Sequence, residues 1–84
     1  MGTEDGSRRW TRLQGQYLAF IHAYTKVNGI VTAEADMQRY FRVTPPTVHR
    51  MVVALEQRGL LQRTPGRGRS IRLLVPPEEV PRLD

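Results

Sequence analysis

The sequence predicts a small, mainly α-helical domain of the α+β class, with three helices followed by a C-terminal β-hairpin. Three observations support this fold. Apolar residues recur at helical spacing in three separate stretches, two short alternating runs near the end flank a Gly-punctuated loop, and the chain has only 84 residues and no cysteine. A chain of this size forms one domain with a modest core and, without cysteine, no disulfide framework.

The first predicted helix begins at Thr11, because Gln14 stands three residues later as a capping-box partner. Asn28-Gly29 is a typical helix end, since glycine readily adopts the left-handed conformation that terminates helices. The apolar side chains at helical spacing that we expect to face the core are Leu13, Tyr17, Phe20, Ile21, Tyr24 and Val27.

The second predicted helix is capped by Thr32 and ends near Arg42, with Glu34 and Asp36 close to its positive N-terminal end. Just before it, Ile30-Val31 is a β-branched pair that we expect to form a third strand beside the hairpin. The side chains expected on the inner face of this helix are Ala33, Met37, Tyr40 and Phe41.

The third predicted helix, residues 44–58, has signals at both ends. The Thr44 hydroxyl is expected to cap a first-turn amide, Pro45 and Pro46 fit a first turn, and Gly59 ends the helix. Its apolar face consists of Val48, Met51, Val52 and Leu55. The opposite face carries short polar groups, one arginine and no carboxylate, which suits a DNA groove: Pro46, Thr47, His49, Arg50, Val53 and Gln57.

The hairpin is predicted from the strand-like runs Leu60–Thr64 and Ser70–Val75, which flank the loop P-G-R-G-R at Pro65–Arg69. Gly66 and Gly68 permit a tight turn there. Ile71, Leu73 and Val75 are expected to face inward. The polar, unpatterned residues 1–9 indicate a flexible arm, residues 10–75 the folded domain, and the Pro/Glu-rich residues 76–84 a tail or linker.

Basic charge is concentrated in the second half of the chain. The net charge is +5 and the pI is about 10.7, which favours a polyanionic partner. Glu56 is the only acid between residues 42 and 72, where the arginines are Arg42, Arg50, Arg58, Arg63, Arg67, Arg69 and Arg72. Such a run can simply be a solvated face, but its coincidence with a capped helix and a hairpin tip favours a contact surface.

A helix followed at once by a basic hairpin is typical of a winged helix. The sequence resembles the winged helix-turn-helix repressors, in particular the DNA-binding domain of the LexA repressor family, over about residues 10–75. The matching motifs are T-x-x-Q at 11–14, F-I at 20–21, Gly29, A-L-x-x-R-G at 54–59 and R-S-I-R-L-L at 69–74, and P-P-T-V-H-R is similar to the start of many recognition helices. Arg42 stands where many such domains have a turn glycine, and Gln38 where a small alanine is usual.

The predicted function is sequence-specific binding of double-stranded DNA by a bacterial or phage-type transcriptional regulator, a repressor. The third helix would enter the major groove, where Arg50 suits guanine O6 and N7, Thr47 a phosphate or thymine methyl, and His49 either a donor or an acceptor. The wing, residues 65–69, would lie on the backbone or in the minor groove. The candidate DNA-binding residues are Thr44, Pro46, Thr47, His49, Arg50, Val53, Arg67 and Arg69.

Several readings of these residues stay open. Arg50 can pair with Glu56 or be solvated, Pro45-Pro46 can serve only to start the helix, and the hairpin arginines can guard exposed strand edges. The main alternative function is a winged-helix protein–protein interaction module without specific DNA binding. RNA binding is a third reading, although the basic face has no stacking aromatic platform.

Other classes are disfavoured. No catalytic motif, nucleotide loop or metal-ligand spacing occurs, so we expect no enzyme, no cofactor and no metal site. Without a signal peptide or an apolar span, we expect a cytoplasmic, nucleoid-associated protein. In the LexA family a linker leads to a self-cleaving peptidase domain, which we do not expect in a chain ending at Asp84. A homodimer on DNA is compatible with the sequence, which shows no clear self-complementary apolar patch.

Overall fold

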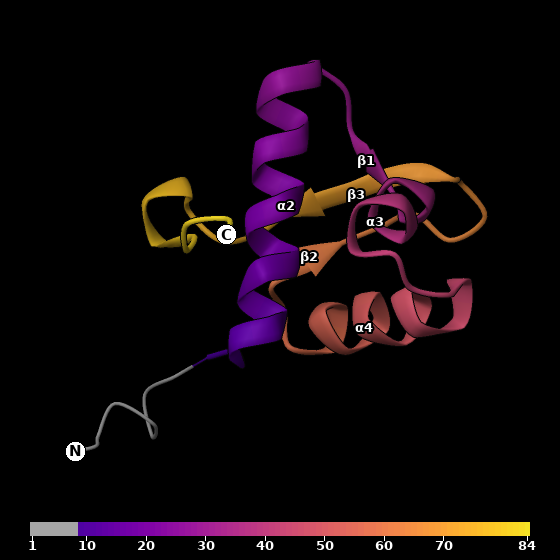
Figure 1. The fold of residues 1–84 in the computed structure, drawn as a ribbon, viewed down its shortest axis with the longest axis horizontal. Helices are drawn as coiled ribbons and strands as arrows, with labels where there is room; N and C mark the ends of the chain where they lie inside the picture. The colour runs from indigo at the N-terminus through magenta and orange to yellow at the C-terminus, as the bar shows by residue number, and fades with distance from the viewer. Residues whose placement is uncertain (1–8) are drawn as a thin grey trace.

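Within residues 9–84, three α-helices and a three-stranded antiparallel sheet form the domain (Figure 1), as the sequence predicts. A computed structural model describes residues 9–84, so the predicted arm lies outside the described residues except for Arg9. The elements in order are α2 (Arg12–Asn28), β1 (Thr32–Ala33), α3 (Glu34–Phe41), α4 (Pro45–Gln57), β2 (Leu61–Gln62), β3 (Arg69–Leu73) and the 3-10 helix η1 (Pro77–Glu79).

The ends of α2 follow the local sequence signals. Thr11 is the N-cap, its Oγ1 accepts the Gln14 amide at 3.1 Å, and the Gln14 side chain accepts the Thr11 amide at 2.9 Å. This is the predicted capping box. At the other end, Gly29 adopts φ 69° as the C-cap, and its amide donates to the Thr25 carbonyl. Both predicted termini are confirmed.

The buried face of α2 is shorter than its apolar pattern suggests. Leu13 and Val27, expected in the core, are 55% and 80% exposed. They lie in the first and last turns of the helix, and the C-terminal end of α2 projects beyond the sheet and the other two helices (Figure 1). The middle of α2 is buried instead, including Leu18 and Ala19, which the apolar stripe did not contain.

The start of α3 differs from the prediction by one residue. Thr32 is not the cap; it is fully buried in β1, and Ala33 occupies the N-cap position. The Ala33 amide donates to the carboxylate of Asp36 at 2.9 Å, so an acid inside the helix satisfies the helix start. Tyr40, expected inside, is 46% exposed because it lies at the outer edge of an aromatic cluster with Phe20 and Phe41.

The turn between α3 and α4 is made by Arg42 in the left-handed conformation, with φ 57° and ψ 50°. Within residues 9–84 it is the one non-glycine residue with positive φ. This conformation costs energy for a side chain with a Cβ atom. Glycine adopts the same conformation without this cost, which agrees with the resemblance that predicts a turn glycine at this position.

Helix α4 begins after Thr44 and ends before Gly59, as predicted, but one detail is wrong. The Thr44 hydroxyl makes no capping bond to a backbone amide and instead lies 2.9 Å from the Thr47 hydroxyl. At the C-terminal end, Gly59 has φ 76°, its amide donates to the Glu56 carbonyl, and the next amide donates to the Leu55 carbonyl. These two bonds form a Schellman motif.

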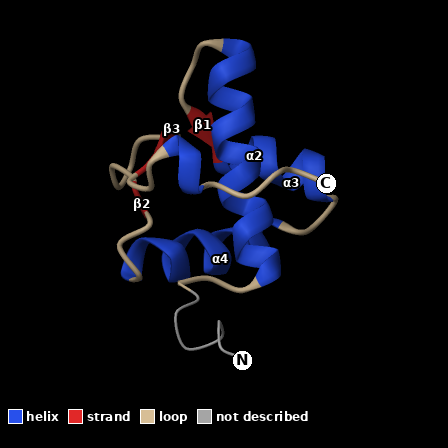
Figure 2. Ribbon diagram, turned by 90° about the vertical axis from the view of Figure 1, so that its left-hand side faces the viewer, coloured by secondary structure: helices blue, strands red, loops and turns tan. Residues whose placement is uncertain are grey.

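The sheet has the order β1-β3-β2, with β3 in the centre. The predicted third strand exists, but it is Thr32–Ala33 rather than Ile30-Val31. Thr32 lies opposite Ile71 and Ala33 opposite Arg69, so one step on β1 matches two on β3. Ser70 is the extra residue of this β-bulge. The strands lie along one side of the helices (Figure 2).

The core is formed between α2, α4 and the inner face of the sheet. On α4, Val48, Val52 and Leu55 are fully buried, and on β3 Ile71 is 2% exposed. These inward-facing positions of α4 and β3 were predicted from their spacing. Because the inner face of α4 is fixed in the core, its opposite face is necessarily presented outward.

Residues 76–84, predicted to be a tail or linker, lie against the N-terminal half of α2. The Gln16 side-chain amide donates to the Arg82 carbonyl and accepts the Asp84 amide, at 2.9 and 2.8 Å. Val80 and Leu83 are partly buried against the core. The packing has a plain cause, since the Pro/Glu-rich segment contains apolar residues that reach uncovered surface of α2.

Candidate nucleic-acid interface

The outer face of α4 is open over its first two turns. Pro46, His49 and Arg50 are exposed, whereas Thr47 and Val53 are half-buried. Glu56, a predicted alternative partner of Arg50, instead accepts a hydrogen bond from Arg63 Nε at 3.1 Å. Within residues 9–84 Arg50 forms no ion pair, so its guanidinium is available to a ligand.

His49 does not stand alone on this face. Its Nδ1 lies 3.1 Å from Oε2 of Glu34 in the first turn of α3. The sequence placed Glu34 only near a helix terminus, and nothing in its spacing relates it to a residue 15 positions away. If Nδ1 carries the proton, it donates to the carboxylate and Nε2 becomes the free ring nitrogen.

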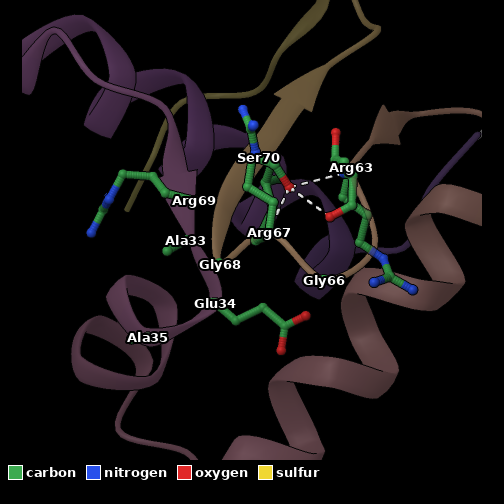
Figure 3. Close-up of a pocket in the computed structure, with 11 residues that line it drawn as sticks. Ala33, Glu34, Ala35, Arg63, Gly66, Arg67, Gly68, Arg69 and Ser70 are labelled. Atoms are coloured by element: carbon green, nitrogen blue, oxygen red, sulfur yellow. Dashed lines mark hydrogen bonds between the residues drawn. The ribbon is translucent and has the colours of Figure 1, made fainter.

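Glu34 also lines a groove between the start of α3 and the hairpin (Figure 3). The groove has a volume of about 640 Å³, and the Glu34 side chain extends into it. Its lining residues are Ala33, Glu34, Ala35, Arg63, Thr64, Gly66, Arg67, Gly68, Arg69, Ser70 and Ile71. Since Glu34 also contacts His49, the start of α3 lies between the hairpin and α4.

The hairpin loop is closed by a turn and a buried hydroxyl. The Arg67 amide donates to the Thr64 carbonyl at 3.1 Å, and Gly66 has φ 81°, so Thr64 to Arg67 form a type II turn. Ser70, 8% exposed, accepts the Thr64 amide at 2.9 Å across the loop (Figure 3). Arg67 is thereby held at an exposed tip, where it was predicted. The role of Ser70 was not predicted.

Arg69 is not at the tip, where the sequence placed it. It is the first residue of β3, and its Nη1 donates to Oδ2 of Asp36 at 2.8 Å. The same nitrogen donates to the Val31 carbonyl at 3.0 Å and to the Tyr24 hydroxyl at 3.3 Å. Figure 3 shows the Arg69 side chain pointing to the opposite side of the hairpin from Arg63. The Arg69 guanidinium is therefore bound by groups of the domain itself.

The partner of Arg69 is a buried carboxylate. Burial alone would raise the pKa of Asp36, but hydrogen bonds from Arg69 and the Ala33 amide outweigh it and lower the pKa below its ordinary value of 3.8. In turn, the hydrogen bond to Asp36 raises the pKa of Arg69. The pair is thus ionised at neutral pH.

The first turn of α4 and the hairpin tip lie at the same end of the molecule, with the C-terminus at the opposite side (Figure 1). The structure therefore places the first turn of α4 and the hairpin tip, which carries Arg67, at one end of the molecule, whereas the Arg69 guanidinium is engaged by Asp36. A helix-turn-helix followed by a hairpin, with an arginine on the open helix face and another at the hairpin tip, defines a winged helix-turn-helix DNA-binding domain.

Comparison with known proteins gives the family. Residues 7–70 match the family described as LexA DNA binding domain. The LexA repressor of Thermosipho africanus is 39% identical over 70 residues, which cover 83% of this chain and 35% of that protein. The LexA repressor of Thermosipho melanesiensis is 34% identical over 73 residues, 87% of this chain and 37% of that protein.

The chain belongs to the LexA DNA-binding domain family. Like the DNA-binding domain of a LexA repressor, it is a DNA-binding domain. It spans about a third of the length of these curated relatives. No helix among residues 9–84 has the length and apolarity to cross a membrane, and no cluster of three or more His, Cys, Asp or Glu that could hold a metal ion occurs in that range.

Proposed function

We propose that the domain binds specific double-stranded DNA sites as the DNA-reading part of a transcriptional repressor. The first turns of α4 enter the major groove, and the hairpin tip lies on the backbone or in the adjacent minor groove. The observation that supports this is Arg50 on the open face of α4, which forms no ion pair within residues 9–84. The first turn of α4 lies at the same end of the molecule as the hairpin tip, to which Arg67 belongs (Figure 1). Among the described residues neither side chain has an ion-pair partner, so both arginines can bind an anionic, hydrogen-bonding partner.

The residues of α4 have distinct proposed roles. Arg50 binds guanine O6 and N7 in a bidentate manner, which contributes roughly 1–3 kcal/mol of base discrimination. Thr44 and Thr47, whose hydroxyls are 2.9 Å apart, face a phosphate at the positive end of the helix. Pro46 and Val53 supply apolar contact with the groove.

His49 is proposed to read a base edge under the control of Glu34. With Nδ1–H donating to the carboxylate 3.1 Å away, Nε2 of the neutral ring is an acceptor. An acceptor suits the exocyclic amine of adenine or cytosine. The Glu34 carboxylate itself disfavours a phosphate in the groove beside the hairpin, which restricts how DNA can be seated there.

A salt titration with duplex DNA tests the function. Groove binding predicts that the logarithm of the affinity falls linearly with the logarithm of salt concentration, with a slope of about −0.9 per neutralised phosphate. It also predicts that one sequence is enriched from a random duplex pool. Weak binding with no enriched sequence would instead favour the protein-interaction module.

Two arginine variants separate base reading from backbone contact. Arg50→Ala is expected to relax base choice at one position, and Arg67→Ala to weaken all sequences alike and reduce the salt slope by about one. Arg82→Ala is the charge-matched control, because Arg82 lies in the C-terminal segment against α2. If Arg50→Ala and Arg67→Ala change selectivity and slope in the same way, the assignment of roles is wrong.

A further inference from the structure

We infer that the Asp36–Arg69 pair is a latch that positions the hairpin tip relative to α4, so that both residues act in DNA binding without touching DNA. This inference rests on the proposed function. It replaces the expectation that Arg69 contacts DNA, and it assigns a role to a buried acid that the basic character of the surface did not suggest.

The latch joins segments that are distant in sequence. Besides its bond to Asp36, the Arg69 guanidinium donates to the Val31 carbonyl just before β1 and to the Tyr24 hydroxyl on α2. The Asp36 carboxylate also accepts the Ala33 amide at 2.9 Å and Arg39 Nη2 at 2.7 Å. One carboxylate therefore connects the base of the hairpin to the first helix of the helix-turn-helix.

Of the two partners only Asp36 is buried, and Arg69 is held by its hydrogen bonds to this carboxylate and to its neighbours. The Asp36 side chain is 1% exposed, and that of Arg69 is 41% exposed. Removing Arg69 from Asp36 would leave a buried carboxylate whose remaining charged partner within residues 9–84 is the exposed Arg39, which is costly. Arg69 is therefore not available to move out to a phosphate, whereas Arg50 and Arg67 form no ion pair within the part of the chain that the structure describes.

The latch lies where it can fix the position of the hairpin tip. Arg69 follows Arg67 by two residues and begins the central strand. The backbone pairing that holds this strand to the helix-turn-helix is short, because β1 has two residues and the pairing is interrupted by a bulge at Ser70 of β3. Ser70 closes the loop onto Thr64 but does not attach it to α3. The latch supplies that attachment.

Latching and direct contact predict opposite results for Asp36→Asn. If Arg69 contacted DNA, this substitution would release an arginine and remove a negative charge, so binding would be unchanged or stronger. If the pair positions the hairpin, Asp36→Asn and Arg69→Met should each weaken binding to the selected duplex by about tenfold. Arg39→Met is the control, because it removes another partner of Asp36 that does not belong to the hairpin.

A double-mutant cycle separates positioning from a general loss of folding. In the Asp36→Asn background, Arg67→Ala should have almost no further effect, whereas Arg50→Ala should retain its full effect. Equal effects of Arg67→Ala in both backgrounds, or binding by Asp36→Asn as tight as wild type, would overturn the latch. Should Asp36→Asn fail to fold, Arg69→Lys, which keeps the charge but not the fork of donors, takes its place in the same cycle.

Hydrogen exchange of the amides of residues 64–70 tests the latch without DNA. Faster exchange in Arg69→Met than in Arg39→Met supports it, and equal exchange contradicts it. If the wild-type domain selects no duplex, the proposed function fails, and this measurement still decides whether the hairpin is held by the pair.

Discussion

At the scale of single residues, Asp36 shows how an acidic side chain contributes to a basic surface. It lies behind that surface, buried, and accepts from Arg69, Arg39 and the amide that starts α3. Replacing any of these bonds by water would leave a charge in a poorly solvated position. The domain thus uses one buried charge to hold an arginine of the hairpin, leaving Arg67 for the ligand.

The lowered pKa of Asp36 predicts how acid affects folding. Because its folded pKa lies below the ordinary 3.8, the unfolded chain binds more protons in that range. The contribution of Asp36 to stability is therefore present above about pH 3.8 and is lost as the pH falls through the lower, folded value. Asp36→Asn should reduce stability at pH 7 and make it less dependent on pH below 4.

Urea denaturation at pH 7, 4 and 3 checks this prediction. Asp84→Asn is a suitable control, since the Asp84 side chain is 61% exposed in its pair with Arg12 and should contribute little. If wild type and Asp36→Asn lost equal free energy of unfolding between pH 4 and pH 3, Asp36 would not be the group responsible.

At the scale of elements, local signals were sufficient for most helix ends. Thr11, Gln14, Gly29 and Gly59 act through atoms within a few residues, and all four were predicted correctly. Thr32 failed for a reason outside its neighbourhood. Strand β3 pairs with it and buries it, which shifts the start of α3 by one residue.

The residues of the candidate site also divide into those whose position could be predicted from local sequence and those whose position depends on the fold. The inner face of α4 follows from spacing alone, and its burial determines which of its residues are outward. By contrast, Arg67 and Arg69 are indistinguishable in the sequence, two arginines separated by a glycine. Their difference arises from Asp36, 33 positions earlier, which only the fold brings beside Arg69. The contact of His49 with Glu34 has the same origin.

The C-terminal end of α4 provides a prediction about backbone conformation. A Cβ atom added at Gly59 or at Gly68 would meet nothing within 4 Å, but only Gly59 has a positive φ, 76°. Gly59→Ala should therefore destabilise the domain by about 1 kcal/mol through backbone strain, while Gly68→Ala should be neutral or slightly stabilising. Thermal or urea unfolding of the two variants measures this. Equal losses of unfolding free energy in the two variants would show that backbone strain at Gly59 is not the cause.

At the scale of the whole molecule, the chain beyond the hairpin completes the folded body. Residues 76–84 return to α2, where Arg12 pairs with Asp84 at 2.6 Å, and Tyr40 of α3 donates to the Asp84 carbonyl at 3.2 Å. Pro81 packs so closely that a Cβ atom on Gly15 would lie 3.1 Å from it. The end of the domain that we propose faces DNA is thus opposite an end that its own C-terminal segment covers.

This packing predicts that the segment contributes to stability although its composition resembles a linker. Leu83 is partly buried against the core, whereas Leu13, on α2, is 55% exposed. Leu83→Ala should lower the free energy of unfolding by about 1–2 kcal/mol, because buried apolar surface is returned to water, and Leu13→Ala should change it by less than about 0.5 kcal/mol.

A chain ending at Val75 should lose at least as much free energy of unfolding as Leu83→Ala. Urea unfolding compares the three, and a truncated chain as stable as the full one would show that the segment is not part of the folded body. DNA affinity measured well below the unfolding midpoint should be nearly equal in all of them, because the segment lies away from α4 and the hairpin tip (Figure 1).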